Sequence, residues 1–147
     1  MPFLGGYAIK FAVSFGAVSA FSAYLMTSLA LVDEGWGGLW VCIGSASFIV
    51  GYSLSYWLVE RKTECANSRL VLVGSLIAVL SHWLSWYGFL LVNYVQWKFF
   101  GKALDFDPID PVMGLGVAWG YSLFSLAFLG WLSLPLAIFL SFNIQRP

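Results

Sequence analysis

Residues 111–142 read PVMGLGVAWGYSLFSLAFLGWLSLPLAIFLSF and contain no Asp, Glu, Lys, Arg or His. A bilayer core of about 30 Å is crossed by roughly 20 apolar helical residues, so this stretch is long enough to span one. Backbone N–H and C=O groups find no water inside hydrocarbon and must bond to each other, which favours a helix. The stretch therefore predicts a transmembrane helix.

Three more stretches of the same kind precede it. The charged residues fall in clusters that leave uncharged runs at about residues 11–32, 38–59 and 70–95. Of the 147 residues, 61% are hydrophobic and only 10% are charged, whereas soluble domains carry about 25% charged residues. This composition excludes an ordinary soluble globule, and the zero net charge offers no basic face for nucleic acid. We predict an all-α fold, with residues 1–147 forming a single transmembrane domain of four bundled helices.

Lysine and arginine predict the orientation of the bundle, because cytoplasmic connections retain these residues. One set of connections comprises the N-terminal segment, the loop 60–69 and the C-terminal tail, and it sums to +3 (five basic, two acidic). The loops 33–37 and 96–110 sum to −3 (two basic, five acidic). The five basic residues of the first set are Lys10, Arg61, Lys62, Arg69 and Arg146. We predict cytoplasmic termini, outer loops at 33–37 and 96–110, and a multi-pass location in a bacterial inner membrane.

Aromatic residues gather near the predicted ends of the spans, as Tyr and Trp do at the headgroup level. Tyr7 and Trp57 fall on the predicted cytoplasmic side, and Trp97 falls on the outer side. The segment that follows Gln96 has an amphipathic start, which predicts that it lies along the membrane surface.

The fourth span carries its own start signal and a bend signal. Asp110 followed by Pro111 predicts a helix N-cap with proline at the first helical position. A helix from Val112 to Phe142 would be about 46 Å long, which exceeds the hydrocarbon core. We expect Pro135 to bend it, with the residues after Pro135 running along the cytoplasmic interface.

The single histidine, His82, falls near the middle of the third span. At 100° per residue a polar stripe forms around it, made of Ser75, His82, Ser85 and Asn93. Two interpretations compete. The stripe is a functional polar site, since ionisable groups inside a membrane are by default candidates for one, or a neutral imidazole hydrogen-bonds a neighbouring helix and fixes the packing. We favour packing.

Small residues at four-residue spacing let transmembrane helices approach closely. The fourth span contains Gly116 and Gly120 in a GxxxG pattern, which we propose as a partner-facing surface. The first two spans carry two further ridges, for which packing inside the bundle is the preferred interpretation. These ridges are Ala12, Gly16, Ala20 and Ser47, Gly51, Ser55.

Catalytic and cofactor motifs are missing from the sequence. It has no HExxH, no GxxxxGK[ST] and no Gly-rich dinucleotide turn. The two cysteines, Cys42 and Cys65, fall at different predicted depths, which argues against a disulfide. We therefore predict no catalytic residue, no metal site and no cofactor, and a protein that is not an enzyme.

Two functional hypotheses follow. The first is a small non-enzymatic membrane protein that acts through helix–helix interaction. It would serve as an accessory or assembly subunit of a membrane complex, or as an immunity- or exclusion-type factor. Besides the lipid bilayer, its partner would be another membrane protein or further copies of itself. The alternative is a small oligomeric transporter or channel with a polar path around His82.

Overall fold

The computed structural model of the chain describes residues 6–29, 38–60, 66–102 and 107–144. These residues form α1 (Gly6–Leu29), α2 (Leu39–Ser55), α3 (Asn67–Phe100) and α4 (Pro111–Asn143), and a π-helical turn, η2 (Tyr56–Glu60), continues α2. No strand occurs within these ranges. All four helices, α2 together with η2, are long and apolar enough to cross a membrane. The all-α prediction and its four membrane-length helices are confirmed.

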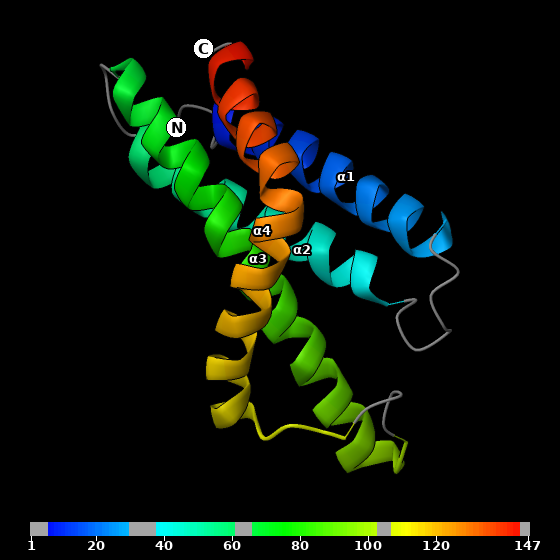
Figure 1. The fold of residues 1–147 in the computed structure, drawn as a ribbon. Coiled ribbons are helices and arrows are strands. Elements are labelled where there is room, and N and C mark those ends of the chain that lie inside the picture. The colour runs from blue at the N-terminus through cyan, green and yellow to red at the C-terminus, as the bar shows by residue number, and fades with distance from the viewer. Residues whose placement is uncertain (1–5, 30–37, 61–65, 103–106, 145–147) are drawn as a thin grey trace.

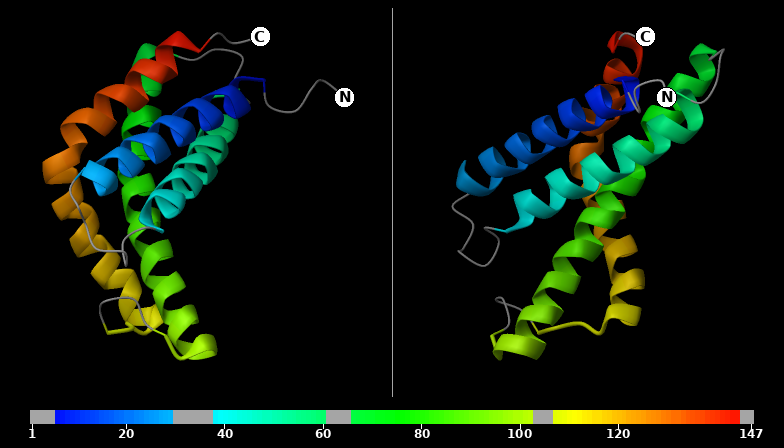
Figure 2. Two further views of the ribbon diagram at one scale, coloured as in Figure 1. Left: turned by 90° about the vertical axis from the view of Figure 1, so that its right-hand side faces the viewer. Right: turned by 180° about the vertical axis from the view of Figure 1, so that it is seen from behind.

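The helices form two hairpins. Figure 1 shows α1 beside α2 and the long helix α3 beside α4, and Figure 2 shows the two hairpins crossing at a large angle. The start of α1, the end of η2, the start of α3 and the end of α4 share one end of the molecule, named here the Tyr7 end. The start of α4 and the end of α3 lie at the opposite end, named here the Gly101 end. The end of α1 and the start of α2 lie to one side of the molecule, short of the Gly101 end (Figures 1 and 2).

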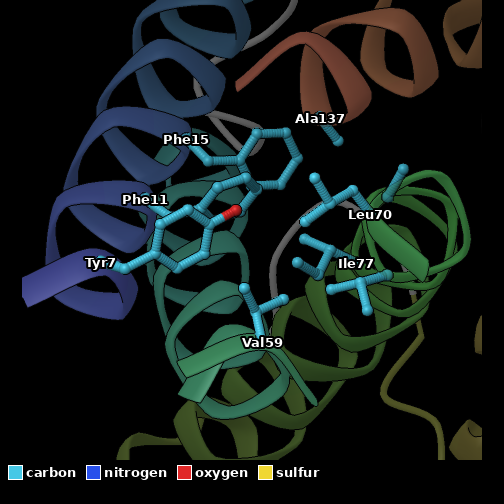
Figure 3. Close-up of a cluster of buried hydrophobic side chains, with 9 residues drawn as sticks. Tyr7, Phe11, Phe15, Val59, Leu70, Ile77 and Ala137 are labelled. Atoms are coloured by element: carbon cyan, nitrogen blue, oxygen red, sulfur yellow. The ribbon is translucent and has the colours of Figure 1, made fainter. Parts of the chain in front are cut away.

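The hydrophobic core lies toward the Tyr7 end, where the two hairpins meet. Aromatic side chains of α1 point across to aliphatic side chains of α3 and the end of η2, and Ala137 of α4 closes the cluster (Figure 3). Fully burying a large apolar side chain away from water stabilises a fold by about 1.5–3 kcal/mol. The cluster comprises Tyr7, Phe11, Phe15, Val59, Leu70, Val73, Ile77, Ala78 and Ala137.

Two polar contacts tie the Tyr7 end together. The Tyr7 hydroxyl donates to the backbone carbonyl of Ser141 over 2.9 Å, joining the start of α1 to the end of α4. The Ala8 N–H donates to Glu60 Oε2 over 3.1 Å. The first N–H groups of a helix have no partner within it, so the Glu60 carboxylate satisfies one and interacts favourably with the helix dipole. Tyr7 is only 1% exposed, so its side chain belongs to the core rather than to the surface of the bundle.

Helix α3 is longer than the predicted span 70–95. It runs from Asn67 to Phe100, and it ends where Gly101 adopts φ 65° and donates its N–H to the Trp97 carbonyl. Residues 96–100 were expected to begin an outer loop along the membrane surface, and that prediction is wrong. One lysine in this stretch does not interrupt the helical hydrogen bonds, whereas glycine readily takes the left-handed conformation that ends a helix.

Helix α4 begins as predicted. The Asp110 side chain accepts a hydrogen bond from the Val112 N–H at 2.9 Å, and Pro111 takes the first helical position. The helix continues through Pro135 to Asn143, and its axis curves along its length (Figure 2, left). The residues after Pro135 do not run separately along an interface. Ala137 and Ser141 are buried against the rest of the bundle, because the curve turns the last part of α4 back onto α1 and α3.

Glycines set the closest approaches between helices. A Cβ added at Gly44 of α2 would lie 2.8 Å from the Ala20 Cβ of α1, and one at Gly16 would lie 3.2 Å from the Gly44 carbonyl oxygen. A Cβ at Gly74 of α3 would lie 3.0 Å from both the N and the Cα of Ile138 in α4. The packing interpretation holds for Gly16 and Ala20 of the first ridge and for Gly51 of the second, which lies against Phe11 and Ala12.

Candidate functional site

His82 joins α3 to α4 through both ring nitrogens. Nδ1 lies 2.9 Å from Ser125 Oγ, and Nε2 lies 3.0 Å from Ser133 Oγ. The two serines are eight residues apart on α4, so the imidazole bridges two successive stretches of the same helix face. This is the contact with a neighbouring helix that the packing interpretation requires.

The hydrogen bonds around His82 have a definite direction. Ser125 Oγ donates its one proton to the Ser122 carbonyl at 3.0 Å, so toward His82 it can only accept. Nδ1 therefore carries the proton, and in a neutral ring Nε2 accepts from the Ser133 hydroxyl. A chain of donors runs from Ser133 through His82 and Ser125 to a backbone carbonyl. All the hydrogen-bonding capacity of the ring is used within the protein.

The other members of the predicted stripe separate into two groups. Ser85 is buried, donates to the Ser81 carbonyl at 2.6 Å, and lines the same cavity as His82. Ser75 donates to the Val71 carbonyl of its own turn at 2.9 Å and does not line that cavity. Asn93 is fully buried but lies about 16 Å further along α3, at 1.5 Å per residue. The structure thus brings together His82 and Ser85, and neither Ser75 nor Asn93 belongs to their site.

A cavity of about 180 Å³ opens beside His82, between the two hairpins. All four helices contribute to its lining, which combines hydroxyl side chains with large apolar ones. Apolar residues dominate the surface that faces the cavity, because several of the hydroxyls turn back to backbone carbonyls. The lining comprises Phe15, Ser19, Ser22, Ala23, Thr27, Leu39, Ile43, Ser47, Ser81, His82, Ser85, Trp86, Ser125, Leu129, Leu132, Ser133 and Leu136.

Aromatic side chains fill the contact between α3 and α4 toward the Gly101 end. The rings of Trp83 and Trp119 have centroids 5.7 Å apart, and those of Trp86 and Tyr121 are 5.0 Å apart. Trp83 also stacks on Tyr87 within α3 at 5.8 Å. Such pairs add about 0.5–1.5 kcal/mol beyond their burial. These residues hold the hairpin together, and Trp86 alone among them also reaches the cavity.

The predicted partner surface on α4 is open in the structure. Gly116 and Gly120 are exposed, and a Cβ added at either glycine would meet no atom within 4 Å. A second ridge of small residues on the opposite face packs against α3, and the sequence analysis missed it. Its members are Gly114, Ala118, Ser122 and Ser125, all buried. Gly114, Ala118 and Ser122 follow one another at four-residue spacing, which is also the spacing of Gly116 and Gly120, and Ser125 comes three residues after Ser122.

Serines on α4 were the other residues that sequence reasoning missed. Ser125 and Ser133 hold His82, yet each is one of many serines in the chain and neither follows a motif. Some residues used in the predictions from the sequence lie outside the described ranges, namely Arg61, Lys62, Cys65 and Arg146. Across the described ranges, no group of three or more His, Cys, Asp or Glu is arranged to hold a metal ion.

Ser133→Ala is expected to lower the free energy of unfolding by about 0.6 kcal/mol and by no more than about 1.7 kcal/mol, the average and the maximum for hydrogen bonds between transmembrane helices. Ser75→Ala is the matched control, because its hydroxyl bonds only within its own helix, and it should leave stability nearly unchanged. SDS titration of the protein in detergent micelles measures the stability of both variants.

The ¹⁵N spectrum of His82 should show a protonated Nδ1 and an unprotonated Nε2, and the reverse tautomer would contradict the assigned direction of the hydrogen bonds.

Comparisons with known proteins give no further lead. No protein-family model, no curated protein and no solved structure matches this chain.

Proposed function

We propose that the chain is a multi-pass protein of a bacterial inner membrane that acts through association of its helices with those of another membrane protein. Both ends of the chain face the cytoplasm in this proposal, and the protein serves as an accessory or assembly subunit or as an immunity- or exclusion-type factor. The observation that carries the proposal is the open small-residue face of α4.

That face points away from the rest of the bundle. Val112, Gly116, Gly120 and Leu123 fall within about 40° of one direction on the helix, and all four are exposed. The buried ridge of α4 lies on the opposite side and already packs on α3. In lipid, helix association depends on how closely backbones approach, and glycines four residues apart permit the closest approach. An exposed face of this kind is suited to pack against a further transmembrane helix.

The charges of the described residues agree with a membrane position. Lys10, Glu60 and Arg69 lie at the Tyr7 end, and Lys98, Lys102, Asp107 and Asp110 lie at the Gly101 end. The length of helix between these clusters carries no formal charge. This distribution supports insertion of the four helices across a bilayer, with headgroups at both ends.

Adding a bulky side chain to the open face of α4 should disrupt association without unfolding the protein. Gly116→Leu is expected to abolish co-purification of the partner, or the homo-oligomer, in mild detergent, since the leucine side chain would keep a second helix from approaching the α4 backbone closely. Gly88→Leu on α3 is the matched control, because a Cβ there also meets no atom within 4 Å. The measurement is native mass spectrometry of the purified complex. A wild-type protein that purifies only as a monomer, or a Gly116→Leu variant that retains its partner, would contradict the proposal.

A second candidate is a small oligomeric transporter, and the cavity beside His82 is the observation that favours it. In that case the purified protein in liposomes should move a labelled solute, and variants of cavity residues should slow the flux. The use of both His82 nitrogens in contacts with α4 makes this candidate the weaker one.

A further inference from the structure

A serine, a histidine and a second serine form a hydrogen-bonded series beside the cavity. Ser133 Oγ lies 3.0 Å from His82 Nε2, and His82 Nδ1 lies 2.9 Å from Ser125 Oγ. Because Ser125 donates its proton to the Ser122 carbonyl, Nδ1 carries the ring proton and Nε2 accepts from Ser133. A serine that donates to one histidine nitrogen, while the other nitrogen donates to a third group, has the arrangement of an activated nucleophile.

Ser133 is the member of this series that is placed to attack a bound molecule. Ser133 and His82 are both partly exposed and both line the cavity of about 180 Å³. Ser133 Oγ accepts no hydrogen bond from the described residues, so its lone pairs are free. Ser125, in contrast, is buried, and its one proton is bonded to a backbone carbonyl. In this arrangement Ser133 is the nucleophile, His82 is the base, and Ser125 is a positioning residue.

Three further hydroxyls of the cavity come from the first hairpin. Ser19 and Ser22 of α1 and Ser47 of α2 line the cavity, and none of them makes a hydrogen bond with the described residues. Ser81 also belongs to the lining, but its Oγ is fully enclosed. When a carbonyl group is attacked, its oxygen becomes negatively charged and is stabilised by hydroxyl donors. The first hairpin therefore supplies donors for such an oxygen.

The lining restricts the molecule that Ser133 can attack. The described lining side chains include no Asp, Glu, Lys or Arg, and a charged group would lose its hydration there without a counter-charge. An apolar cavity of about 150 Å³ holds benzene, so a volume of about 180 Å³ suits an apolar group of about six carbon atoms. The group that accepts from Nδ1 is a hydroxyl, so an imidazolium has no negative charge beside it. Such a base suits an acyl donor whose leaving group is weakly basic, which an aryl ester or a thioester provides.

We infer that Ser133 and His82 form an acyl-transfer site for a neutral aryl ester or thioester with an acyl group of about six carbon atoms. His82 Nε2 takes the Ser133 proton as the bond from Oγ to the carbonyl carbon forms. It returns the proton to the leaving oxygen or sulfur as that atom's bond to the carbonyl carbon breaks. Water then attacks the acyl carbon and gives a proton to Nε2, and Ser133 recovers this proton as the acid is released.

This inference is independent of the open face of α4. It departs from the sequence-based prediction that the chain has no catalytic residue. The motifs missing from the sequence do not bear on it, because two residues brought together by different helices need no fixed spacing along the chain.

Diisopropyl fluorophosphate tests the nucleophile directly, because an activated serine attacks its phosphorus and releases fluoride. The protein in nanodiscs is treated with this reagent, and its intact mass is followed with time. We expect a single adduct, located on Ser133 by peptide sequencing and absent from Ser133→Ala. His82→Gln should slow its formation by about 100-fold or more, the usual contribution of a general base. The wild-type protein, but not Ser133→Ala, should also hydrolyse p-nitrophenyl hexanoate.

Two further variants complete the design. Ser75→Ala, a serine of the same helix as His82 outside the cavity, should react at the wild-type rate. Ser125→Ala removes the acceptor of Nδ1, so it should slow the reaction about tenfold or more and give a mixture of His82 tautomers in the ¹⁵N spectrum. Should His82→Gln fail to fold, the location of the wild-type adduct still decides. Absence of an adduct, an adduct on another residue, a wild-type rate in His82→Gln, or equal ester hydrolysis by Ser133→Ala would each overturn the inference.

Discussion

Gly74→Ala is expected to lower the free energy of unfolding by about 1–3 kcal/mol, the usual cost of overpacking a tight contact. The added Cβ would lie 3.0 Å from the backbone N and Cα of Ile138 and 3.2 Å from the Ala137 carbonyl carbon. All three are backbone atoms, so no side chain can rotate away and α4 itself must shift. The contact lies in the core cluster, next to Ala137 and Val73, so a shift there loosens several helices together.

The control for this prediction lies on the same helix. Gly88→Ala introduces the same methyl group where no atom lies within 4 Å. Alanine has a higher helix propensity than glycine by up to about 1 kcal/mol, so this variant should be neutral or slightly more stable. SDS titration in detergent micelles compares both variants with the wild type. Equal stabilities for Gly74→Ala and Gly88→Ala would contradict the close contact between α3 and α4.

Gly44→Ala should be destabilising by a similar amount, about 1–3 kcal/mol, because its Cβ would lie 2.8 Å from the Ala20 Cβ. Here the obstructing atom is itself a removable methyl group. In the double variant with Ala20→Gly the clash disappears, and α1 and α2 can return to their original separation. The double variant should therefore be more stable than Gly44→Ala alone.

The thermodynamic cycle decides this prediction. Ala20→Gly alone should cost about 0.5–1 kcal/mol through the flexibility of glycine in a helix. An interaction energy of at least about 0.5 kcal/mol between the two positions is expected for residues in direct contact. The same SDS titrations supply all four stabilities. Strict additivity would show that α1 and α2 do not approach each other at this point.

Much of the fold could be predicted from the sequence because long uncharged apolar stretches indicate helices of membrane-spanning length. The charge clusters marked four helices, and the Asp110–Pro111 pair marked the start of α4. The positions of the helix ends were harder to predict. Residues 96–100 extend α3 because nothing there breaks the backbone hydrogen bonds before Gly101.

The site was less accessible to sequence reasoning, because it depends on which helix faces which. The stripe through Ser75, His82 and Asn93 follows from the geometry of one helix, whereas the actual partners of His82 lie on α4. The same difficulty affects small residues. Gly114 and Gly116 belong to ridges of equal spacing, and only the position of α3 determines which ridge is buried.

The central claim is that four helices cross the membrane with the Tyr7 end in the cytoplasm, and single-cysteine labelling in intact cells tests it most directly. In a background with Cys42 and Cys65 replaced by serine, a cysteine is introduced by Asp107→Cys or by Arg69→Cys. A membrane-impermeant maleimide should label the Asp107→Cys protein in intact cells, and the Arg69→Cys protein only after permeabilisation. Labelling of both from the same side would show that α3 does not cross the membrane, and labelling of the Arg69→Cys protein alone in intact cells would contradict the cytoplasmic position of the Tyr7 end.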